Sequence, residues 1–415
     1  MVGPVDGYDE DADIYQLLAS RLYPTLSSLL AHDAPYYHRP SRSWFVTRHR
    51  DVLTLLTDRR LAGRSSDEST SDLSAAERAL AAPVEEHLAR WLVFSDADRL
   101  AGLRRAFRAT LNAAATSGWR DRFDQLARDQ VAAWPAGTDA VPSAGTDATP
   151  LVGADLVSEV IAPFTVAGIT DVLGAPAEDR DRIGRWGLDL LGYLSLDSFH
   201  EPLVAAAASA LANLVDYFQH RYLPTAKGEV ADCFRTTLGQ GADPADLAAV
   251  FTQLLTGGLE PTRTALALGY AWLAEPGRRA VFAAHPDGFV DEVLRLACPF
   301  HFAPRTAIAD ISVGGRRITA GSRVTLLLVG ANRDPLAFPR PDQIDPDRPL
   351  RRHLTFGRGP HFCMGARLSA HLVRAGLGAL TDPPAWPPVG RPAPQITRTA
   401  GMTWVRSMRL NRAIG

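Results

Sequence analysis

The sequence has few cysteines and no excess of charge of either sign. Three cysteines occur among 415 residues, Cys233, Cys298 and Cys363, and no C-x-x-C pair is present. An odd number of widely spaced cysteines argues against a disulfide framework and against a cysteine-based zinc site. The formal net charge of -2 at pH 7 gives no reason to expect nucleic acid or a membrane surface as a partner.

Long apolar runs are missing as well. No stretch approaches the roughly 18 apolar residues of a membrane-spanning helix. Residues 1–16 are acidic and lack the basic start and apolar run of a signal peptide. We therefore expect a soluble, cytoplasmic protein. Its 46% hydrophobic and 22% charged residues are ordinary for a globular chain with a sizeable core.

The spacing of apolar residues predicts a mainly α fold with a small β portion. Helical spacing is found at residues 17–30, from Asp51 onward, and at 154–174 and 203–222, whereas short strand-like stretches are found at 44–47, 311–315 and 323–329. Between Pro135 and Pro150 a segment of small polar residues repeats itself. Such a segment cannot pack a core, so we interpret residues 135–150 as a flexible surface loop.

One cysteine near the end of the chain lies in an unusual setting, Phe356-Gly357-Arg358-Gly359-Pro360-His361-Phe362-Cys363-Met364-Gly365. Its glycines let the backbone approach a bulky planar group, and N–H groups in such a turn can point at the sulfur. A lone cysteine in a glycine-rich loop is usually structural. Here six positions match the pattern F-G-x-G-x-H-x-C-x-G. The segment therefore resembles the cysteine loop of the cytochrome P450 superfamily, in its soluble bacterial branch.

The resemblance runs from about Tyr36 to the C-terminus, and it implies both a fold and a cofactor. The expected fold is a single domain over residues 1–415, a triangular prism with residues 1–35 as a lead-in. Haem b would lie between a long distal helix and the cysteine loop, with the Cys363 thiolate as the axial ligand. A thiolate ligand pushes electron density to the iron and favours O–O cleavage.

Further residues around the haem follow from the same resemblance. Glu292 and Arg295, three apart on a helix, would usually be a surface pair of small worth. The resemblance instead implies a buried network of Glu292, Arg295 and Arg348 that braces the loop. Haem propionates need cations or donors, and the predicted cofactor contacts are Arg104, Arg305, His361, Trp91, Phe356, Gly357 and Gly365. Leu100 replaces a histidine that the family commonly has four residues before the arginine.

The segment 250–265 resembles the helix that crosses the distal face of the haem. The family pattern of a small residue, glycine, any residue, an acid and threonine reads here Gly257, Gly258, Leu259, Glu260 and Pro261. The acid for proton delivery is kept, but the alcohol is replaced. Proline lacks an N–H, so we expect a kink that leaves the Gly257 carbonyl free for a water or a substrate. Thr262 is turned by about 100° and should face elsewhere.

Pro261 leaves more than one activity open. A water or a substrate group could supply the proton route, so that the enzyme hydroxylates a small aromatic or hydrophobic natural product. Alternatively, substrate radicals could couple through a new C–C or C–N bond. Glu260 argues against a peroxide-driven enzyme. A non-enzymatic haem-thiolate sensor is the remotest alternative, because a sensor needs no distal carboxylate.

The expected partners are a small-molecule substrate and a ferredoxin or flavodoxin with its NAD(P)H reductase, acting on a monomer. A basic patch near the thiolate face would steer the acidic carrier; its candidate members are Arg99, Arg104, Arg105, Arg108, Arg351, Arg352 and Arg358. The candidate substrate pocket follows the family's topology and is mostly apolar. Its members would be Ser65, Ser66, Leu194, Phe199, Leu255, Gly258, Leu259, His301, Phe302, Ala303, Met402, Thr403 and Trp404.

Overall fold

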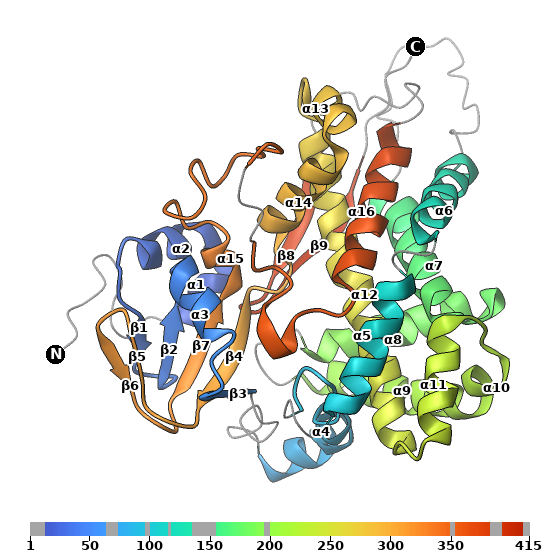
Figure 1. The fold of residues 1–415 in the computed structure, drawn as a ribbon, viewed down its shortest axis with the longest axis horizontal. Helices are drawn as coiled ribbons and strands as arrows, with labels where there is room; N and C mark the ends of the chain where they lie inside the picture. The colour runs from blue at the N-terminus through green and yellow to red at the C-terminus, as the bar shows by residue number, and fades with distance from the viewer. Residues whose placement is uncertain are drawn as a thin grey trace.

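The computed structural model describes residues 13–63, 74–95, 100–114, 118–134, 155–194, 200–348, 353–381 and 392–409. Helices dominate these residues, and most of the strands gather in one lobe (Figure 1). The fold is that expected from the sequence, mainly α with a small β portion.

The largest sheet has five strands in the order β1-β2-β7-β4-β3. Strand β2 runs parallel to β7, and the other neighbours are antiparallel. The sheet joins residues 36–63 to residues 302–327, so distant parts of the chain share one core. Its strands are β1 (Tyr36–His38), β2 (Ser43–Val46), β3 (Leu61–Gly63), β4 (Phe302–Ala307) and β7 (Arg323–Leu327).

Two hairpins complete the β structure. They consist of β5 (Ile311–Val313) with β6 (Arg316–Ile318), and of β8 (Pro394–Arg398) with β9 (Thr403–Met408). Strand β9 packs against the long helix α12, which brings the end of the chain to the centre of the molecule. That contact positions part of the site described below.

Four helices lie with the sheet lobe, namely α1 (Ile14–Ser20), α2 (Leu22–Leu30), α3 (His49–Leu55) and α15 (Leu328–Ala331) (Figure 1). Their apolar side chains and those of the sheet form one hydrophobic cluster. The sequence predicted a single helix over residues 17–30. The structure has two, because Arg21 leaves helical geometry with φ −137° and ψ 46°.

The other helices form the larger lobe. They are α4 (Ala75–Leu88), α5 (Ala101–Ala114), α6 (Trp119–Ala133), the π-helical turn η2 (Val157–Ile161), α7 (Ala162–Leu173), the 3-10 turn η3 (Ala177–Asp179), α8 (Arg180–Leu194), α9 (Glu201–Tyr217), the π-helical turn η4 (Phe218–Tyr222), α10 (Leu223–Thr225), α11 (Glu229–Gly239), α12 (Pro244–Leu273), α13 (Arg278–Ala284), α14 (Pro286–Ala297), the 3-10 turn η5 (Gly359–His361) and α16 (Ala366–Thr381).

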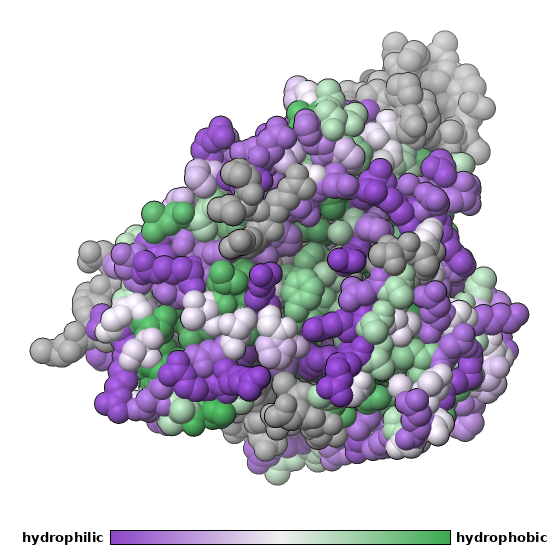
Figure 2. Space-filling view, viewed as in Figure 1, coloured by the Kyte–Doolittle hydropathy of each residue, from purple (hydrophilic) through white to green (hydrophobic). Residues whose placement is uncertain are grey.

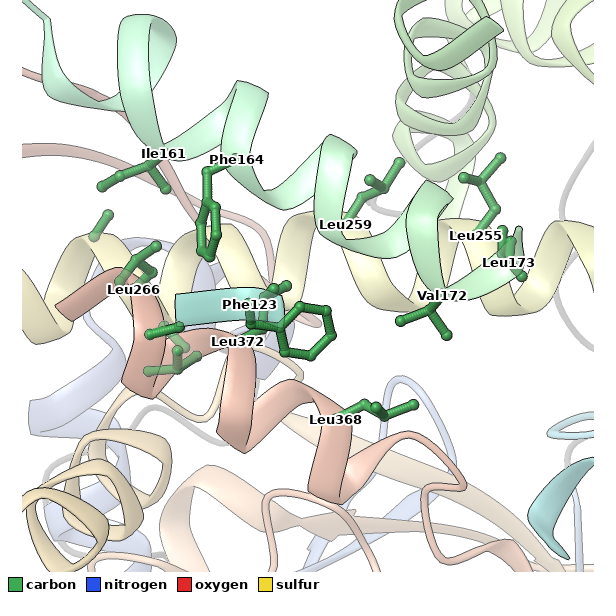
Figure 3. Close-up of a cluster of buried hydrophobic side chains, with 14 of the residues drawn as sticks. Phe123, Ile161, Phe164, Val172, Leu173, Leu255, Leu259, Leu266, Leu368 and Leu372 are labelled. Atoms are coloured by element: carbon green, nitrogen blue, oxygen red, sulfur yellow. The ribbon is translucent and has the colours of Figure 1, made fainter. Parts of the chain in front are cut away.

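Helix α12 is the axis of this lobe: α7 and α16 pack against it, and α6 packs against α16 and α7 (Figure 3). The helix starts at Pro244, whose missing N–H costs nothing in the first turn, and the Asp243 side chain accepts from the Ala245 N–H at 2.9 Å. Glycine allows α16 to lie close to α12: a Cβ at Gly376 would come within 2.7 Å of Leu266. The core is therefore built on close contact of helices.

Most other local predictions are confirmed. Strands at residues 43–46, 311–313 and 323–327 and helices at 162–173 and 201–217 lie where the periodicity placed them. The predicted loop at 135–150 lies outside the described residues. Among the helices that the structure describes, none is long and apolar enough to cross a membrane.

Candidate functional site

The cysteine loop is a tight turn between η5 and α16. The Cys363 N–H donates to the Phe356 carbonyl at 2.9 Å, and the Gly357 N–H donates to the Leu354 carbonyl at 2.8 Å. Gly357 and Gly359 have φ of 65° and 68°, the left-handed region that side chains disfavour. The two glycines are therefore needed by the shape of the turn itself.

The Cys363 side chain is within reach of solvent. Protein nevertheless surrounds the sulfur closely, and this burial raises the pKa of the Cys363 thiol, while the backbone N–H of Gly365 acts to lower it. A Cβ added at Gly365 would meet nothing within 4 Å. The Cys363 side chain is thus exposed at the surface of the loop and has a backbone N–H close to its sulfur, as an iron ligand in this family requires.

Two arginines and a histidine lie beside the loop. Burial, together with the charges of Arg305 and Arg104, lowers the pKa of His361 to about 4. Burial alone lowers the pKa of Arg305 to about 10, and it is also the main cause of the lowered pKa of Arg104. All three groups are therefore desolvated, and the two arginines favour the neutral form of His361.

Neutral carbonyls are the hydrogen-bond partners of these arginines. Arg104 donates to the carbonyls of Pro360, at 2.9 Å, and Leu92, and Arg305 donates to its neighbour Pro304 at 2.8 Å. Within the described part of the chain, no carboxylate forms an ion pair with Arg104, Arg305 or His361. Buried cations without a counter-charge are costly. The residues present therefore fit the two carboxylates of a haem.

Trp91 was a further candidate for a propionate contact. Its side chain is buried, and the indole N–H donates to the Thr252 hydroxyl at 3.0 Å. The His87 ring lies 2.8 Å from the same hydroxyl. The structure thus places the Trp91 donor in a contact between the α4 segment and α12. Phe356 packs against the main hydrophobic cluster beside the loop.

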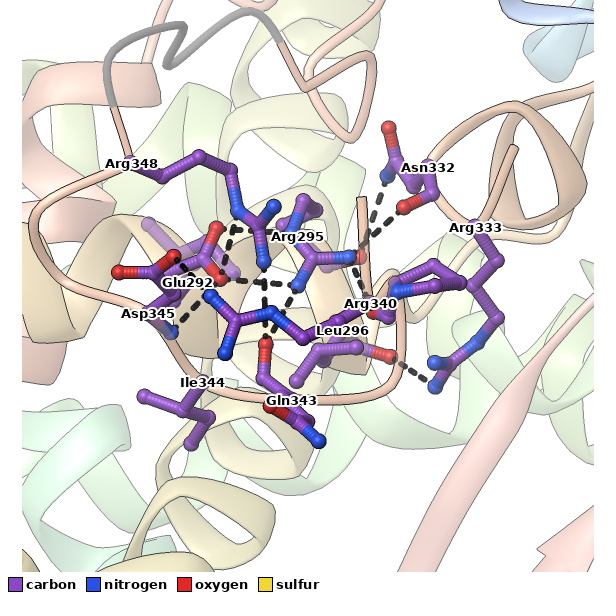
Figure 4. A network of polar contacts seen from close by, with 12 residues as sticks. Glu292, Arg295, Leu296, Asn332, Arg333, Arg340, Gln343, Ile344, Asp345 and Arg348 are labelled. Atoms are coloured by element: carbon purple, nitrogen blue, oxygen red, sulfur yellow. Dashed lines mark hydrogen bonds and ion pairs between the residues drawn. The ribbon is translucent and has the colours of Figure 1, made fainter. Parts of the chain in front are cut away.

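The predicted bracing network is present as a set of contacts (Figure 4). Arg295 binds both oxygens of Glu292, through Nε at 2.8 Å and Nη2 at 2.9 Å, and Arg348 Nε lies 3.2 Å from Glu292 Oε2. Burial acts to raise the pKa of Glu292, but the hydrogen bonds and charges of the two arginines lower it. A carboxylate that stays ionised here holds the segment after β7 against α14.

Asn332 carries this support on to the cysteine loop. Its Oδ1 accepts from the Leu354 N–H at 2.6 Å, and its Nδ2 donates to the Thr355 hydroxyl at 2.9 Å. Thr355 in turn donates to the Leu294 carbonyl of α14 at 2.8 Å. The sequence analysis missed Thr355, because a hydroxyl that bridges segments 61 residues apart leaves no local pattern.

One face of α12 opens away from the core. Gly257 is exposed inside an otherwise mostly buried helix, and a Cβ there would meet nothing within 4 Å. Pro261, one turn further, is half-buried on the same side. The helix continues through Pro261 without a break. Because proline has no N–H, its usual bond to the Gly257 carbonyl cannot form.

The neighbouring candidates point elsewhere. Leu255 and Leu259 lie close to Gly187 of α8 and are buried in the hydrophobic core. A Cβ at Gly258 would come within 2.6 Å of Ile169 of α7. These three residues were predicted as pocket residues; in the structure they are about 100° or more round the helix from Gly257 and pack against other helices.

The hydroxyl groups near Pro261 are already engaged. Thr262 lies 3.2 Å from the Ser369 hydroxyl of α16, as expected of a residue turned away from the Pro261 side. Thr256 donates to the Thr252 carbonyl at 2.7 Å, and Thr264 donates to Glu260 at 2.9 Å. No threonine of α12 is therefore left to replace the missing alcohol.

Glu260 is fully buried beside this face. Burial raises the pKa of Glu260 to about 7, although the charge of Arg263 and the Thr264 hydrogen bond act to lower it. Arg263 forms an ion pair with Oε2, which makes no other polar contact in the described chain. The sequence analysis missed Arg263, although its spacing of three residues from Glu260 is a signal for such a pair.

The predicted contacts from the C-terminal hairpin are largely structural. His301 is buried, with Nδ1 2.8 Å from the Ala400 carbonyl and Nε2 2.8 Å from the Thr403 hydroxyl. Burial lowers the pKa of His301 to about 4. Both ring nitrogens are occupied by the protein, so the structure places His301 and Thr403 in a clasp between β4 and β9 rather than facing a substrate.

The remaining pocket candidates divide into three groups. Met402 and Trp404 form a small buried cluster with Leu191, against which Leu194 packs. Phe302 and Ala303 pack against the cluster of the sheet lobe. Ser65, Ser66 and Phe199 lie outside the described residues.

The predicted basic patch is described only in part. Arg105 and Arg358 are exposed, and Arg108 donates to the Phe362 carbonyl at 3.3 Å. Arg104 is buried instead, and Arg99, Arg351 and Arg352 lie outside the described residues. The face shown in Figure 2 has hydrophobic surface near its centre with hydrophilic surface around it.

Comparisons with known proteins agree with this geometry. The family model described as cytochrome P450 matches residues 287–380. The chain is 29% identical over 341 residues to biflaviolin synthase of Streptomyces coelicolor, covering 80% of this chain and 77% of that protein. It is 31% identical over 239 residues to a methyl-branched lipid omega-hydroxylase of Mycobacterium bovis, and there it spans only about half of each, 54% and 55%.

The fold is shared with solved structures. Epothilone D-bound cytochrome P450epoK superposes with a TM-score of 0.80 at 22% identity, covering 97% of this chain and 100% of that one. In sequence and in fold the chain is therefore similar to the cytochromes P450. These similarities indicate an oxidoreductase that holds haem through a cysteine thiolate, and the exposed Cys363 side chain and the two arginines without a counter-charge fit that group.

Proposed function

We propose that this chain is a monooxygenase that hydroxylates a small aromatic or hydrophobic natural product with electrons from a ferredoxin or flavodoxin. One observation carries the proposal: an exposed cysteine in a glycine-rich loop, Cys363, is combined with a buried acid, Glu260, next to the exposed Gly257 on α12. Haem on a thiolate supplies dioxygen activation and O–O cleavage when it is bound. Relatives named as hydroxylases support this class of reaction.

Within this proposal each group has a role. Arg104, Arg305 and His361 bind the haem propionates, and the bracing network of Glu292, Arg295 and Arg348 keeps the loop in place. Glu260 holds the proton that the reaction consumes, since burial keeps the pKa of its carboxyl near neutral. We also propose that residues 1–415 form one domain and act as a monomer.

The Gly257 carbonyl takes the place of the missing alcohol. It has lost its usual helical donor because Pro261 has no N–H, and Gly257 lies on the exposed side of α12. A water, or a hydroxyl or amide of the substrate, donates to this carbonyl and completes the path from Glu260. This route needs no side-chain hydroxyl, which agrees with the engagement of Thr256, Thr262 and Thr264 elsewhere.

Oxidative coupling is the second candidate function. The same observation favours it, because a site without a hydroxyl on the Pro261 face delivers protons slowly and gives substrate radicals time to combine. The two functions differ in their products. With labelled dioxygen, NAD(P)H and a ferredoxin pair, hydroxylation of a naphthol probe adds one labelled oxygen, whereas coupling gives a dimer that has lost hydrogen and carries no label.

Replacing Pro261 tests the proton route directly. Pro261→Thr should raise the product formed per NAD(P)H and lower the release of hydrogen peroxide, because a hydroxyl then reaches the open face. Pro261→Ala is the matched control, since it restores the backbone N–H without adding a hydroxyl. Equal product yields from the native enzyme and both variants would contradict the role assigned to this position.

A further inference from the structure

The two carboxylate oxygens of Glu260 have different partners. Thr264, one turn further along α12, donates its hydroxyl to Glu260 Oε1 at 2.9 Å, and both side chains are fully buried. On the other oxygen, Oε2, the only contact in the described chain is the ion pair with Arg263. Thr264 thus supplies the hydrogen bond to Oε1, and Arg263 supplies the charge beside Oε2.

Thr264 is itself held by the C-terminal hairpin. The Val405 N–H of β9 donates to the Thr264 hydroxyl at 3.3 Å. A hydroxyl that accepts this donor has its own proton free for Glu260. The Thr264 hydroxyl has two possible acceptors, and the Thr403 carbonyl, at 3.4 Å, is more distant than Glu260 Oε1, at 2.9 Å. The backbone of β9 thus supports the orientation in which Thr264 donates to the acid.

The start of strand β9 is held by hydrogen bonds to the segment before β4. Thr403 binds the His301 ring through its hydroxyl at 2.8 Å, and its N–H donates to the Pro299 carbonyl at 3.0 Å. The His301 N–H donates to the Gly401 carbonyl at 2.8 Å. Three contacts therefore hold the start of β9 two residues before Val405.

We propose that Thr264 is a positioning residue for Glu260: its hydroxyl, oriented by β9, fixes Oε1, while Arg263 pairs with Oε2. Gly257 and Glu260 are three residues apart and therefore neighbours on the helix surface. This inference rests on the proposed role of Glu260 in proton supply. It adds that the acid is set by the hairpin, a segment 140 residues away in sequence.

The charge around Glu260 gives the proposal a measurable consequence. Arg263 on α12 and Arg406 on β9 are the charged groups that act on this carboxyl, and both favour its ionised form, as does the Thr264 hydrogen bond. Removing the hydroxyl while both arginines stay should therefore favour the protonated acid. One hydrogen bond to a charged group corresponds to a shift of about one pH unit.

The experiment measures the protonation of the Glu260 carboxyl rather than the turnover of the enzyme. Infrared difference spectra of the haem-loaded protein, recorded against pH and assigned with Glu260→Gln, report the midpoint of Glu260 protonation. Thr264→Val should move this midpoint upward by about one pH unit, and Thr264→Ser should restore it. Thr256→Val is the matched control, because Thr256 is equally buried in α12 but donates to the Thr252 carbonyl.

Three outcomes would overturn the proposal. They are an unchanged midpoint in Thr264→Val, the same shift in Thr264→Ser, and an equal shift in Thr256→Val. Should Thr264→Val not fold, the comparison of Thr264→Ser with Thr264→Ala decides in the same way. The result is independent of the proposed function, which fails instead if Glu260→Gln leaves the product formed per NAD(P)H unchanged.

Discussion

The two sides of the haem site are built differently. On the cysteine side, the loop residues match the family pattern, and contacts from α14 and Asn332 hold the loop in place. On the distal side, α12 departs from the pattern at Pro261 and leaves an open face at Gly257. Support is dense where the cofactor is held and sparse where the substrate is expected.

The two sides therefore serve different purposes. Residues on the cysteine side hold the cofactor, and they match the family pattern. Residues on the distal side supply protons and contact the substrate, and there the single change at Pro261 alters which groups are available. A family resemblance therefore predicts cofactor binding better than it predicts the reaction.

The strongest way to break the comparison is to remove the ligand on the cysteine side. Cys363→Ser should abolish the thiolate-type spectrum of the reduced, carbon monoxide-bound protein and reduce native turnover to background, because an alcohol donates far less electron density to the metal. Cys233→Ser is the control, since Cys233 lies in α11 away from the loop. Retention of the native spectrum by Cys363→Ser would end this account of the site.

The contribution of the bracing network to stability can be measured at Glu292. Glu292→Gln leaves two buried arginines without a full counter-charge, so the free energy of unfolding should fall by about 3–5 kcal/mol, with weaker haem retention. Asp232→Asn removes a pair of the same i, i+3 spacing on the surface and should cost less than about 1 kcal/mol. Equal losses in the free energy of unfolding of the two variants, measured by chemical denaturation, would show that the network stabilises the protein no more than a surface ion pair does.

These two regions also show what the sequence could predict. Glu292, Arg295 and Cys363 lie in local patterns, and the structure brings Glu292 and Arg295 together as their spacing allowed. Thr355, Thr264 and His301 could not be assigned, because their contacts join segments between 61 and 141 residues apart. The sequence could not show that Leu255 and Leu259 pack against Gly187, because this contact is set by the position of α8.

A smaller effect is expected on the distal side, in the dependence of stability on pH. The pKa of Glu260 is raised in the folded protein from 4.5 to about 7. Between these values the folded state binds more protons than the unfolded state, so this group's contribution to stability falls as pH rises through the window, by up to about 3 kcal/mol.

Buried histidines act in the opposite direction. The pKa values of His87 and His301 are lowered from 6.5 to about 4, so stability from these groups is lost as pH falls through that window. The informative quantity is therefore the difference between the native protein and Glu260→Gln, measured by denaturation at pH 5 and pH 8. The native protein should lose stability relative to the variant as pH rises, and a constant difference would contradict the raised pKa.

The smallest effect is expected at the surface of the cysteine side, where a carrier would dock. Arg105→Glu combined with Arg358→Glu should slow reduction by an acidic ferredoxin about tenfold at low salt and flatten its salt dependence, because the steering charge is reversed. Arg185→Glu makes the same kind of change on α8, which packs against α9 and α12, and should leave the rate nearly unchanged. If Arg185→Glu slows reduction as much as the double variant, net charge rather than a docking patch controls the rate, and the cysteine side would then be specialised only for holding the haem.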